Sequence, residues 1–143
     1  MSRQTGYATA FVLALMLVGA RPASAADPLG TWLTEKSDAR IQITRCGNGI
    51  CGTVVWLKEP IDPATGKPQV DGRNPDPSRQ NRKIIGLRIF SMPSSGPDTW
   101  GGNIYNSDDG KTYTATIKLP RPSQLEVRGC VGPFCGSEMW TRR

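Results

Sequence analysis

From residue 30 to the end of the chain, short runs of β-strand composition alternate with turn-forming residues, and this pattern restricts the fold more than any other feature. The runs occupy residues 30–35, 39–45, 50–57, 84–91, 99–105, 112–119, 124–129 and 137–142. Several alternate strictly, with Ile41 and Ile43 on one face of their run, and Leu125 and Val127 on one face of theirs. A period of two residues places one face of each strand in a core, so the sequence predicts an all-β domain.

The connections between these runs are mostly short and rich in Gly, Asn and Asp, as at 47–49 and 106–110. Turns this tight join antiparallel neighbours. Closure of eight antiparallel strands removes the exposed sheet edges and encloses a small interior. The sequence therefore predicts an antiparallel up-and-down barrel of about eight strands, with an open β-sandwich as the alternative.

One connection, residues 58–83, is long, charged and rich in proline. A connection of this length in a compact domain is usually functional or disordered. Asp76 as N-cap and Pro77 as first helical residue predict a short helical turn, which places Arg79 and Arg82 on one side. Two interpretations are open: a lid that carries two cations over the barrel mouth, and a solvated turn whose arginines pair with nearby aspartates.

Residues 1–25 have the pattern of a secretory signal peptide. Arg3 provides a positive start, residues 10–20 are apolar, and Ala23-Ser24-Ala25 is a small-residue cleavage signal. The apolar stretch is shorter than the about 20 residues of a transmembrane helix, which disfavours the alternative of a membrane anchor. We expect a single β-barrel domain at 26–143, located in the periplasm or secreted.

The four cysteines fall into two pairs that each bracket a turn. Cys46 and Cys51 enclose Asn48-Gly49, and Cys130 and Cys135 enclose Gly132-Pro133. Because export leads to an oxidising compartment, this spacing favours the disulfides Cys46–Cys51 and Cys130–Cys135. Other pairings, a zinc site of four thiolates and a redox-active pair remain alternatives.

Enzymatic chemistry has little support in the sequence. The chain has no histidine, which removes the most common general base and metal ligand. Asp71, Asn74 and Asp76 could contact Ca²⁺, but the rest of an EF-hand spacing is missing. We expect no catalysis, no metal and no cofactor. The net charge of +6 is spread along the chain and no nucleic-acid motif is present, so nucleic acid is not an expected partner.

Residues near the two ends of the domain resemble those of the calycin superfamily of lipocalin-like barrels. Gly30-Thr31-Trp32 matches the G-x-W motif of the first strand, and the chain ends in Trp140-Thr141-Arg142-Arg143. In that superfamily a basic residue on the last strand covers the tryptophan of the first. The resemblance implies structural roles for Gly30, Trp32 and Arg142, with Arg142 in cation–π contact with Trp32.

A second resemblance covers nearly the whole domain. Its motifs include Arg45-Cys46-Gly47, Asn74-Pro75-Asp76-Pro77, Gly110-Lys111-Thr112-Tyr113 and Trp140-Thr141-Arg142. Their order is similar to that of the domain-of-unknown-function family 2147, whose members are small exported bacterial proteins with a calycin-like fold. This resemblance implies fold and export, and it implies no reaction.

The expected function is therefore that of an exported lipocalin-like barrel that holds a small apolar or amphipathic ligand. The residues expected to contact such a ligand are Trp56, Arg79, Arg82, Tyr105, Tyr113 and Arg128. Arg128 would need an anionic partner if it pointed inward, and alternation with Val127 favours the outward direction. The alternatives are a structural or protein-interaction module of the envelope with a filled barrel, and an unrecognised hydrolase. The oligomeric state has no signal in the sequence.

Overall fold

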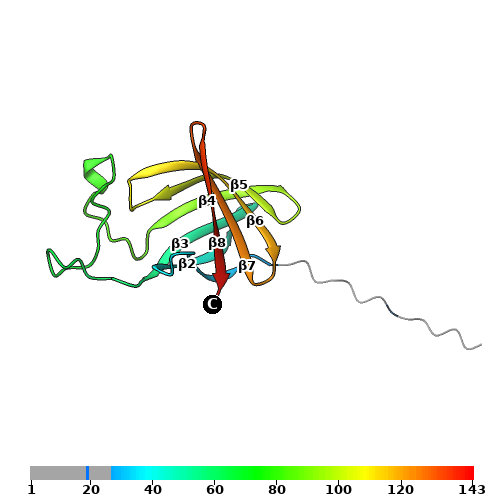
Figure 1. The fold of residues 1–143 in the computed structure, drawn as a ribbon, viewed down its shortest axis with the longest axis horizontal. Coiled ribbons are helices and arrows are strands. Elements are labelled where there is room, and N and C mark those ends of the chain that lie inside the picture. The colour runs from blue at the N-terminus through cyan, green and yellow to red at the C-terminus, as the bar shows by residue number, and fades with distance from the viewer. Residues whose placement is uncertain (1–18, 20–26) are drawn as a thin grey trace, which may run out of the picture.

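The structure is a computed structural model that describes Gly19 and residues 27–143, so the predicted signal peptide, apart from Gly19, lies outside the described residues. The strands are β1 (Gly30–Leu33), β2 (Ala39–Cys46), β3 (Gly49–Leu57), β4 (Arg88–Gly96), β5 (Thr99–Asn106), β6 (Lys111–Arg121), β7 (Gln124–Val131) and β8 (Phe134–Arg142). Each strand pairs antiparallel with the next along the chain, and β8 pairs with β1 to close a barrel (Figure 1). The predicted fold class is confirmed, and the open sandwich is wrong.

Strand direction decides which connections meet at each end of the barrel. The β1–β2, β3–β4, β5–β6 and β7–β8 connections meet at one end, which we call the mouth. The N-terminal residues 27–29 and the remaining turns lie at the other end, which we call the base. In Figure 1 the long β3–β4 connection extends to the left of the barrel.

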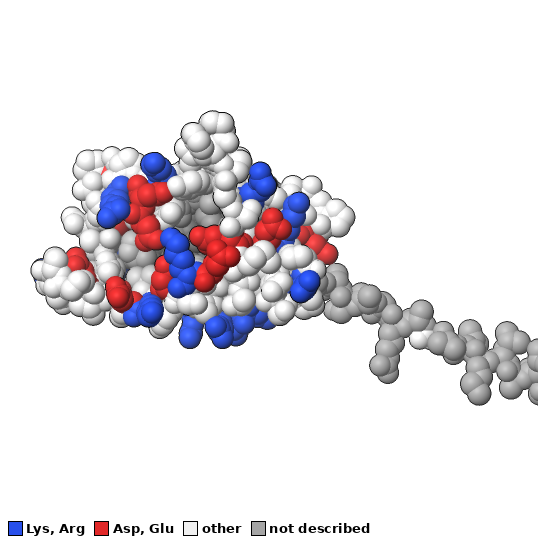
Figure 2. All heavy atoms as spheres, viewed as in Figure 1, with Lys and Arg blue, Asp and Glu red and all other residues white. Residues whose placement is uncertain are grey.

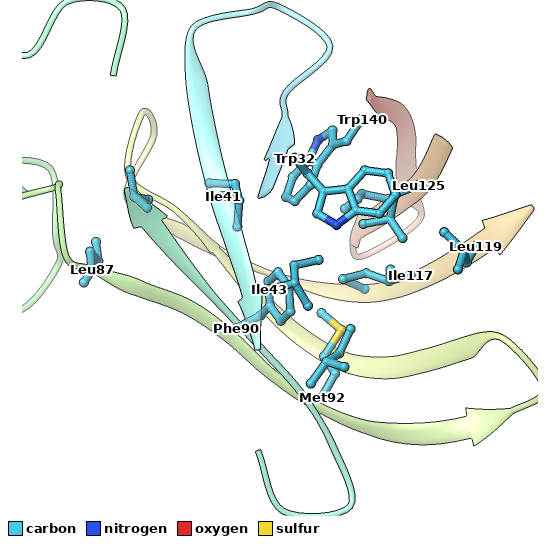
Figure 3. Close-up of a cluster of buried hydrophobic side chains, with 14 of the residues drawn as sticks. Trp32, Ile41, Ile43, Leu87, Phe90, Met92, Ile117, Leu119, Leu125 and Trp140 are labelled. Atoms are coloured by element: carbon cyan, nitrogen blue, oxygen red, sulfur yellow. The ribbon is translucent and has the colours of Figure 1, made fainter. Parts of the chain in front are cut away.

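Alternating residues of all eight strands point inward and fill the centre and base of the barrel. Trp32, Ile117 and Leu125 have no solvent-exposed surface at all. Figure 3 shows the Trp32 ring among Trp140, Leu125 and Ile43. The buried cluster comprises Trp32, Ile41, Ile43, Ile50, Val54, Ile84, Leu87, Phe90, Met92, Ala115, Ile117, Leu119, Leu125, Val127 and Trp140. Burial of these apolar surfaces is the main stabilising contribution to the fold.

Two strands, β4 and β8, differ most from the runs expected from the sequence. The run at 84–91 was too early, because β4 begins only at Arg88; Ile84 and Leu87 close a turn in which the Leu87 N–H donates to the Ile84 carbonyl at 3.0 Å. Both side chains are nevertheless buried, which explains their strand-like composition. The run at 137–142 was too short, because β8 begins at Phe134 and pairs with β7 up to Val131.

The long β3–β4 connection contains a 3-10 helix at Pro77–Arg79, capped by Asp76, whose side chain accepts a hydrogen bond from the Ser78 N–H. Two isolated bridges, Ile61↔Pro68 and Val70↔Lys83, give the connection local order. Along the described part of the chain, no helix is long and apolar enough to cross a membrane.

The seam between the first and last strands is short. β1 has four residues and pairs with β8 only through Trp32↔Arg142 and Leu33↔Thr141. Farther toward the mouth, the Met139 N–H donates to the Glu35 carboxylate at 3.3 Å instead of to a strand. The β7–β8 hairpin continues beyond the barrel as a projecting arm (Figure 1).

Candidate ligand-binding site at the barrel mouth

The base of the barrel is closed by a contact between Trp32 on β1 and Arg142 on β8. The Trp32 Nε1 donates to the Pro28 carbonyl at 2.8 Å, and the Arg142 Cζ lies 4.3 Å from the centroid of the Trp32 ring. This distance permits a cation–π attraction. The same guanidinium donates to the backbone carbonyls of Leu29 at 2.6 Å and Pro122 at 2.7 Å. These bonds fasten the N-terminal segment across the base.

Gly30 is required at the base by two separate constraints. Its φ of 125° lies in a region that residues with a Cβ rarely adopt. A Cβ at this position would also lie 3.0 Å from the Nη1 of Arg142. The structure thus brings Gly30, Trp32 and Arg142 into one contact, which seals the base and leaves the mouth as the open end.

The cysteines form the disulfides Cys46–Cys51 and Cys130–Cys135, the pairings that the spacing favours. The first joins β2 to β3 at the base, and the second joins directly opposite residues of the β7–β8 hairpin near the mouth. No free cysteine occurs among the described residues, so a thiolate zinc site is not formed there.

The long connection is held against β5 by a buried aspartate. Asp71 is completely buried and accepts hydrogen bonds from the Tyr105 hydroxyl at 2.6 Å, the Asn74 Nδ2 at 2.8 Å and the Arg82 Nε at 2.9 Å. All of its donors except Tyr105 belong to the connection itself. The Arg73 Nη1 also donates to the Asp108 carbonyl in the β5–β6 turn at 2.7 Å. Two strand connections at the mouth are thereby joined.

These contacts shift the pKa values of both Asp71 and Tyr105. Burial alone would raise the pKa of Asp71, but hydrogen bonds from Tyr105, Asn74 and Arg82 together hold this pKa below its usual value. Burial and the hydrogen bond to Asp71 raise the pKa of Tyr105. Asp71 is therefore an ionised, fully partnered group whose role in the structure is to anchor the connection.

Arg79 and Arg82, two of the expected ligand contacts, pair with different aspartates. Arg82 pairs with Asp71, whereas Arg79 is mainly exposed and pairs with Asp76 at 3.3 Å. The interpretation as a turn whose arginines pair with nearby aspartates therefore fits better than a lid with two free cations. Asp71 and Asp76 also have separate partners, and within residues 27–143 no three His, Cys, Asp or Glu side chains are grouped as for a metal ion.

Above the buried cluster, the inward faces of β5 to β8 carry residues that stay partly exposed, and we call this region the cup. It is lined by Ile104, Tyr113, Gly129, Gly136 and Glu138. None of these five residues is fully buried, whereas Ala115, Val127 and Trp140, which lie nearer the base on the inner faces of β6, β7 and β8, are buried. A Cβ at Gly136 would meet no heavy atom within 4 Å. Figure 2 shows the molecule hollowed beside the projecting hairpin.

The carboxylates at the cup accept hydrogen bonds from uncharged side chains. Glu138 pairs with inward-facing Val127, and its Oε2 accepts a hydrogen bond from the Trp140 Nε1 at 3.0 Å. The Tyr113 hydroxyl donates to Asp109 in the β5–β6 turn, and this hydrogen bond raises the pKa of Tyr113. Tyr113, one of the expected contact residues, thus lies in the cup.

Two other expected contact residues, Trp56 and Arg128, do not face the interior, and for Arg128 this is the direction that alternation favours. Trp56 shares the outer face with its register partner Arg40, whose Cζ lies 4.6 Å from the ring centroid. Arg128 is exposed, because its neighbour Val127 occupies the inner face. Tyr105 is also withdrawn from a ligand, because its hydroxyl is bound to Asp71.

Two clefts lie outside the cup. One, of about 290 Å³, is at the base between the N-terminal segment and the β2–β3 turn, and its lining includes Asp27, Leu29, Arg45 and Trp100. The other, of about 240 Å³, is on the outer face of β6 and β7, lined by Thr116, Lys118, Glu126 and Arg128. Both clefts mix opposite charges at the surface.

The sequence did not predict the place of Glu138 in the cup, and it named Asp71 only as a possible Ca²⁺ contact and not as a buried anchor. The expected strand at 137–142 already contains Glu138 and Trp140, and alternation from Trp140 places Glu138 on the inner face. Asp71 lies in an irregular connection, where no periodicity indicates burial.

Comparison with known proteins agrees with this architecture. Residues 30–142 match the family described as "Uncharacterized protein conserved in bacteria (DUF2147)". A solved structure from Helicobacter pylori, protein HP1028, described as belonging to the lipocalin family, is similar at a TM-score of 0.69 and 20% identity. The similarity covers 82% of this chain and 84% of that chain, and at this identity it shows the fold alone. None of the curated proteins matches the chain. The protein therefore belongs to the DUF2147 family of bacterial proteins and has a lipocalin-like barrel fold.

Proposed function

We propose that the protein binds a small amphipathic ligand in the cup and catalyses no reaction on it. The observation that carries this proposal is the contrast in solvent access along the inner face. Inward residues at the mouth are partly exposed, while Trp140, Val127 and Ile117 beneath them form a sealed apolar floor. A concave apolar surface with a few polar groups is the usual form of a small-molecule site.

The long connection supports the same proposal. The Asp71 contacts hold it beside the β5–β6 turn, so the rim of the mouth is pre-formed. A site that is already ordered loses less conformational entropy when a ligand binds. Arg82 and Tyr105 serve this function by positioning the rim.

The proposal is tested by filling the cup from one position of β8. A neutral fluorescent probe, N-phenylnaphthylamine, is titrated into the purified protein and into two variants. Gly136→Phe adds a ring on the inward face where space is free, and we expect it to weaken probe binding by about tenfold. Ser137→Phe adds the same ring on the outward face of the next residue and serves as the matched control.

The two variants separate cup binding from general surface adsorption. Equal probe affinity in wild type, Gly136→Phe and Ser137→Phe would show that the probe does not enter the cup. Saturable binding that only Gly136→Phe weakens would support the proposed site. Far-UV circular dichroism of each variant controls for loss of the barrel.

A second candidate function, protein contact in the bacterial envelope, is favoured by the tip of the β7–β8 hairpin. Phe134 is 79% exposed there, and the Cys130–Cys135 disulfide fixes the arm that presents it. Exposed aromatic side chains are enriched in protein interfaces. A photo-cross-linking residue at Pro133 should then capture a protein in the native cell, whereas one at Lys118 on the barrel wall should not.

We also propose that the chain acts outside the cytoplasm after removal of residues 1–25. The two disulfides support this location, because disulfides persist in oxidising compartments. The leader pattern of the sequence and the bacterial family are consistent with export.

A further inference from the structure

We propose that the cup selects ligands with a protonated amine or a similar cationic head group attached to an apolar tail, and that Glu138 provides the counter-charge. This inference rests on the proposed function and names the class of ligand for the same site.

Glu138 is placed where a ligand head group would reach the floor of the cup. Its register partner Val127 and its neighbour Trp140 both belong to the buried cluster, so the carboxylate lies on the inner face directly above that cluster. On β8 the next inward position toward the mouth is Gly136, which leaves free space. A ligand can therefore approach the carboxylate from the mouth without displacing a side chain.

The charge of Glu138 has no protein partner of opposite sign. Its one hydrogen bond comes from the neutral Trp140 indole. Between residues 27 and 143 the ion pairs within 4 Å are Arg79–Asp76 and Arg82–Asp71, both in the long connection. A partly buried carboxylate beside apolar side chains loses solvation, and a cation with hydrogen-bond donors compensates for that loss.

The other acidic groups at the mouth add to the same potential. Asp109 is bonded to the Tyr113 hydroxyl, and Glu35 to the Met139 N–H, so each receives its hydrogen bond from an uncharged donor. Figure 2 shows acidic side chains at the border of the hollow, with Lys and Arg side chains among them. These carboxylates would repel an anionic head group. The cup should therefore select ligands by the charge of the head group as well as by shape.

The direction of the tail follows from β8. Beyond Gly136 the same face of the strand continues to Phe134, whose ring is exposed at the hairpin. An alkyl chain with its amine at Glu138 would extend past Gly136 toward Phe134 and Tyr113. The site thus offers a charged end in the cup and an apolar end at the rim.

Three probes of equal chain length and different head group test the charge preference: octylamine, octanol and octanoate. Octylamine is protonated at neutral pH, like a lysine side chain. Affinities are measured by displacement of N-phenylnaphthylamine and by isothermal titration calorimetry. We expect wild-type protein to bind octylamine more tightly than octanol, and octanol more tightly than octanoate.

Two isosteric variants assign the preference to Glu138. Glu138→Gln keeps an oxygen that accepts from Trp140, and it should weaken octylamine binding by about tenfold while leaving octanol unchanged. Glu126→Gln makes the same charge change on β7, where Glu126 pairs with Met139 outside the core, and should leave all three affinities unchanged. Gly136→Phe should weaken all three probes equally.

The outcomes separate this inference from the proposed function. If all three probes bind wild type equally, or if Glu138→Gln and Glu126→Gln have the same effect, the role of Glu138 is overturned while ligand binding stands. If no probe, including N-phenylnaphthylamine, binds wild type, the proposed function fails and this inference fails with it. A melting temperature for Glu138→Gln near that of wild type confirms that the barrel is intact.

Discussion

At the scale of single residues, burial separates side chains of the same chemical type into different roles. Trp32 has no exposed surface, whereas Trp56 lies outside the core beneath Arg40. Asp71 is completely buried with three donors, whereas Asp76 is exposed and caps a 3-10 helix. Residue type alone therefore does not determine how much stability a substitution costs. In each pair, the exposed residue serves as the control for the buried one.

Trp32→Ala should lower the free energy of unfolding by about 3–5 kcal/mol, because it leaves a large cavity in the core and removes the ring beneath Arg142. Trp56→Ala is the matched control and should cost about 1 kcal/mol, since it removes only a surface stacking contact. Urea unfolding followed by circular dichroism measures both. Similar losses in the two variants would contradict the assignment of Trp32 to the closed base.

The stabilising contribution of Asp71 should be lost in acid. The pKa of Asp71 is lower in the folded protein than in the unfolded chain, where it is about 3.9. Its contribution is fully present above the unfolded value and is lost as the pH falls through the folded value. Asp71→Asn should cost about 3 kcal/mol at neutral pH, because Arg82 loses its buried partner.

Urea unfolding at a series of pH values tests this linkage. Stability of Asp71→Asn should depend less on pH below about pH 4 than that of wild type. Asp76→Asn, which changes an exposed carboxylate that also has a lowered pKa, should have the smaller effect at neutral pH. An Asp71→Asn variant with wild-type acid sensitivity would rule out Asp71 as the source.

At the scale of elements, sequence pattern located the strands well where one face is buried and the turn is short. β2, β6 and β7 alternate strictly and lie within two residues of the expected bounds. The expected strand bounds were wrong where tertiary contacts, and not local alternation, determine which residues are buried or paired. Ile84 and Leu87 are apolar because a turn buries them, and β8 extends as an arm beyond the barrel that no alternation with a core could indicate.

The two disulfides, although identical in spacing, should differ in reactivity because their elements differ in exposure. Cys135 is exposed on the projecting hairpin, whereas Cys51 is buried at the base. Thiol–disulfide exchange requires access of the attacking thiolate to a sulfur atom. Brief treatment with a mild reductant followed by alkylation and peptide mass spectrometry should label Cys130 and Cys135 first.

Labelling of Cys46 and Cys51 at the same rate would contradict this order. Replacement of either pair by alanine should cost about 2 kcal/mol in the chain-entropy description of a short loop. The expected difference therefore concerns the rate of reduction, while the two stabilisation energies remain similar.

At the scale of the whole molecule, the sequence predicted the barrel, its family and its closed base, but it did not predict the cup. Barrel closure follows from strand number and short turns, which are local properties. The cup depends on which inward positions remain uncovered at the mouth, and that depends on the three-dimensional register of Gly129, Gly136 and Glu138. The outward direction of Arg128, in contrast, follows from alternation with Val127 along one strand.

Export predicts a specific mature protein. Intact mass measurement of the protein purified from the envelope of its own cells should give a chain that begins at Ala26 and carries two disulfides. An uncleaved chain recovered with the membrane fraction would favour an anchored form. A chain with four free thiols would contradict the proposed compartment.

The two-residue seam between β1 and β8 also has a consequence for the order in which the barrel assembles. The other strand pairs join neighbours along the chain, whereas the seam joins the first strand to the last. Closing so long a loop carries the largest entropic cost, so the seam should form after the folding transition state. Arg142→Ala should accordingly accelerate unfolding while leaving the refolding rate almost unchanged, and stopped-flow kinetics in urea can separate the two rates.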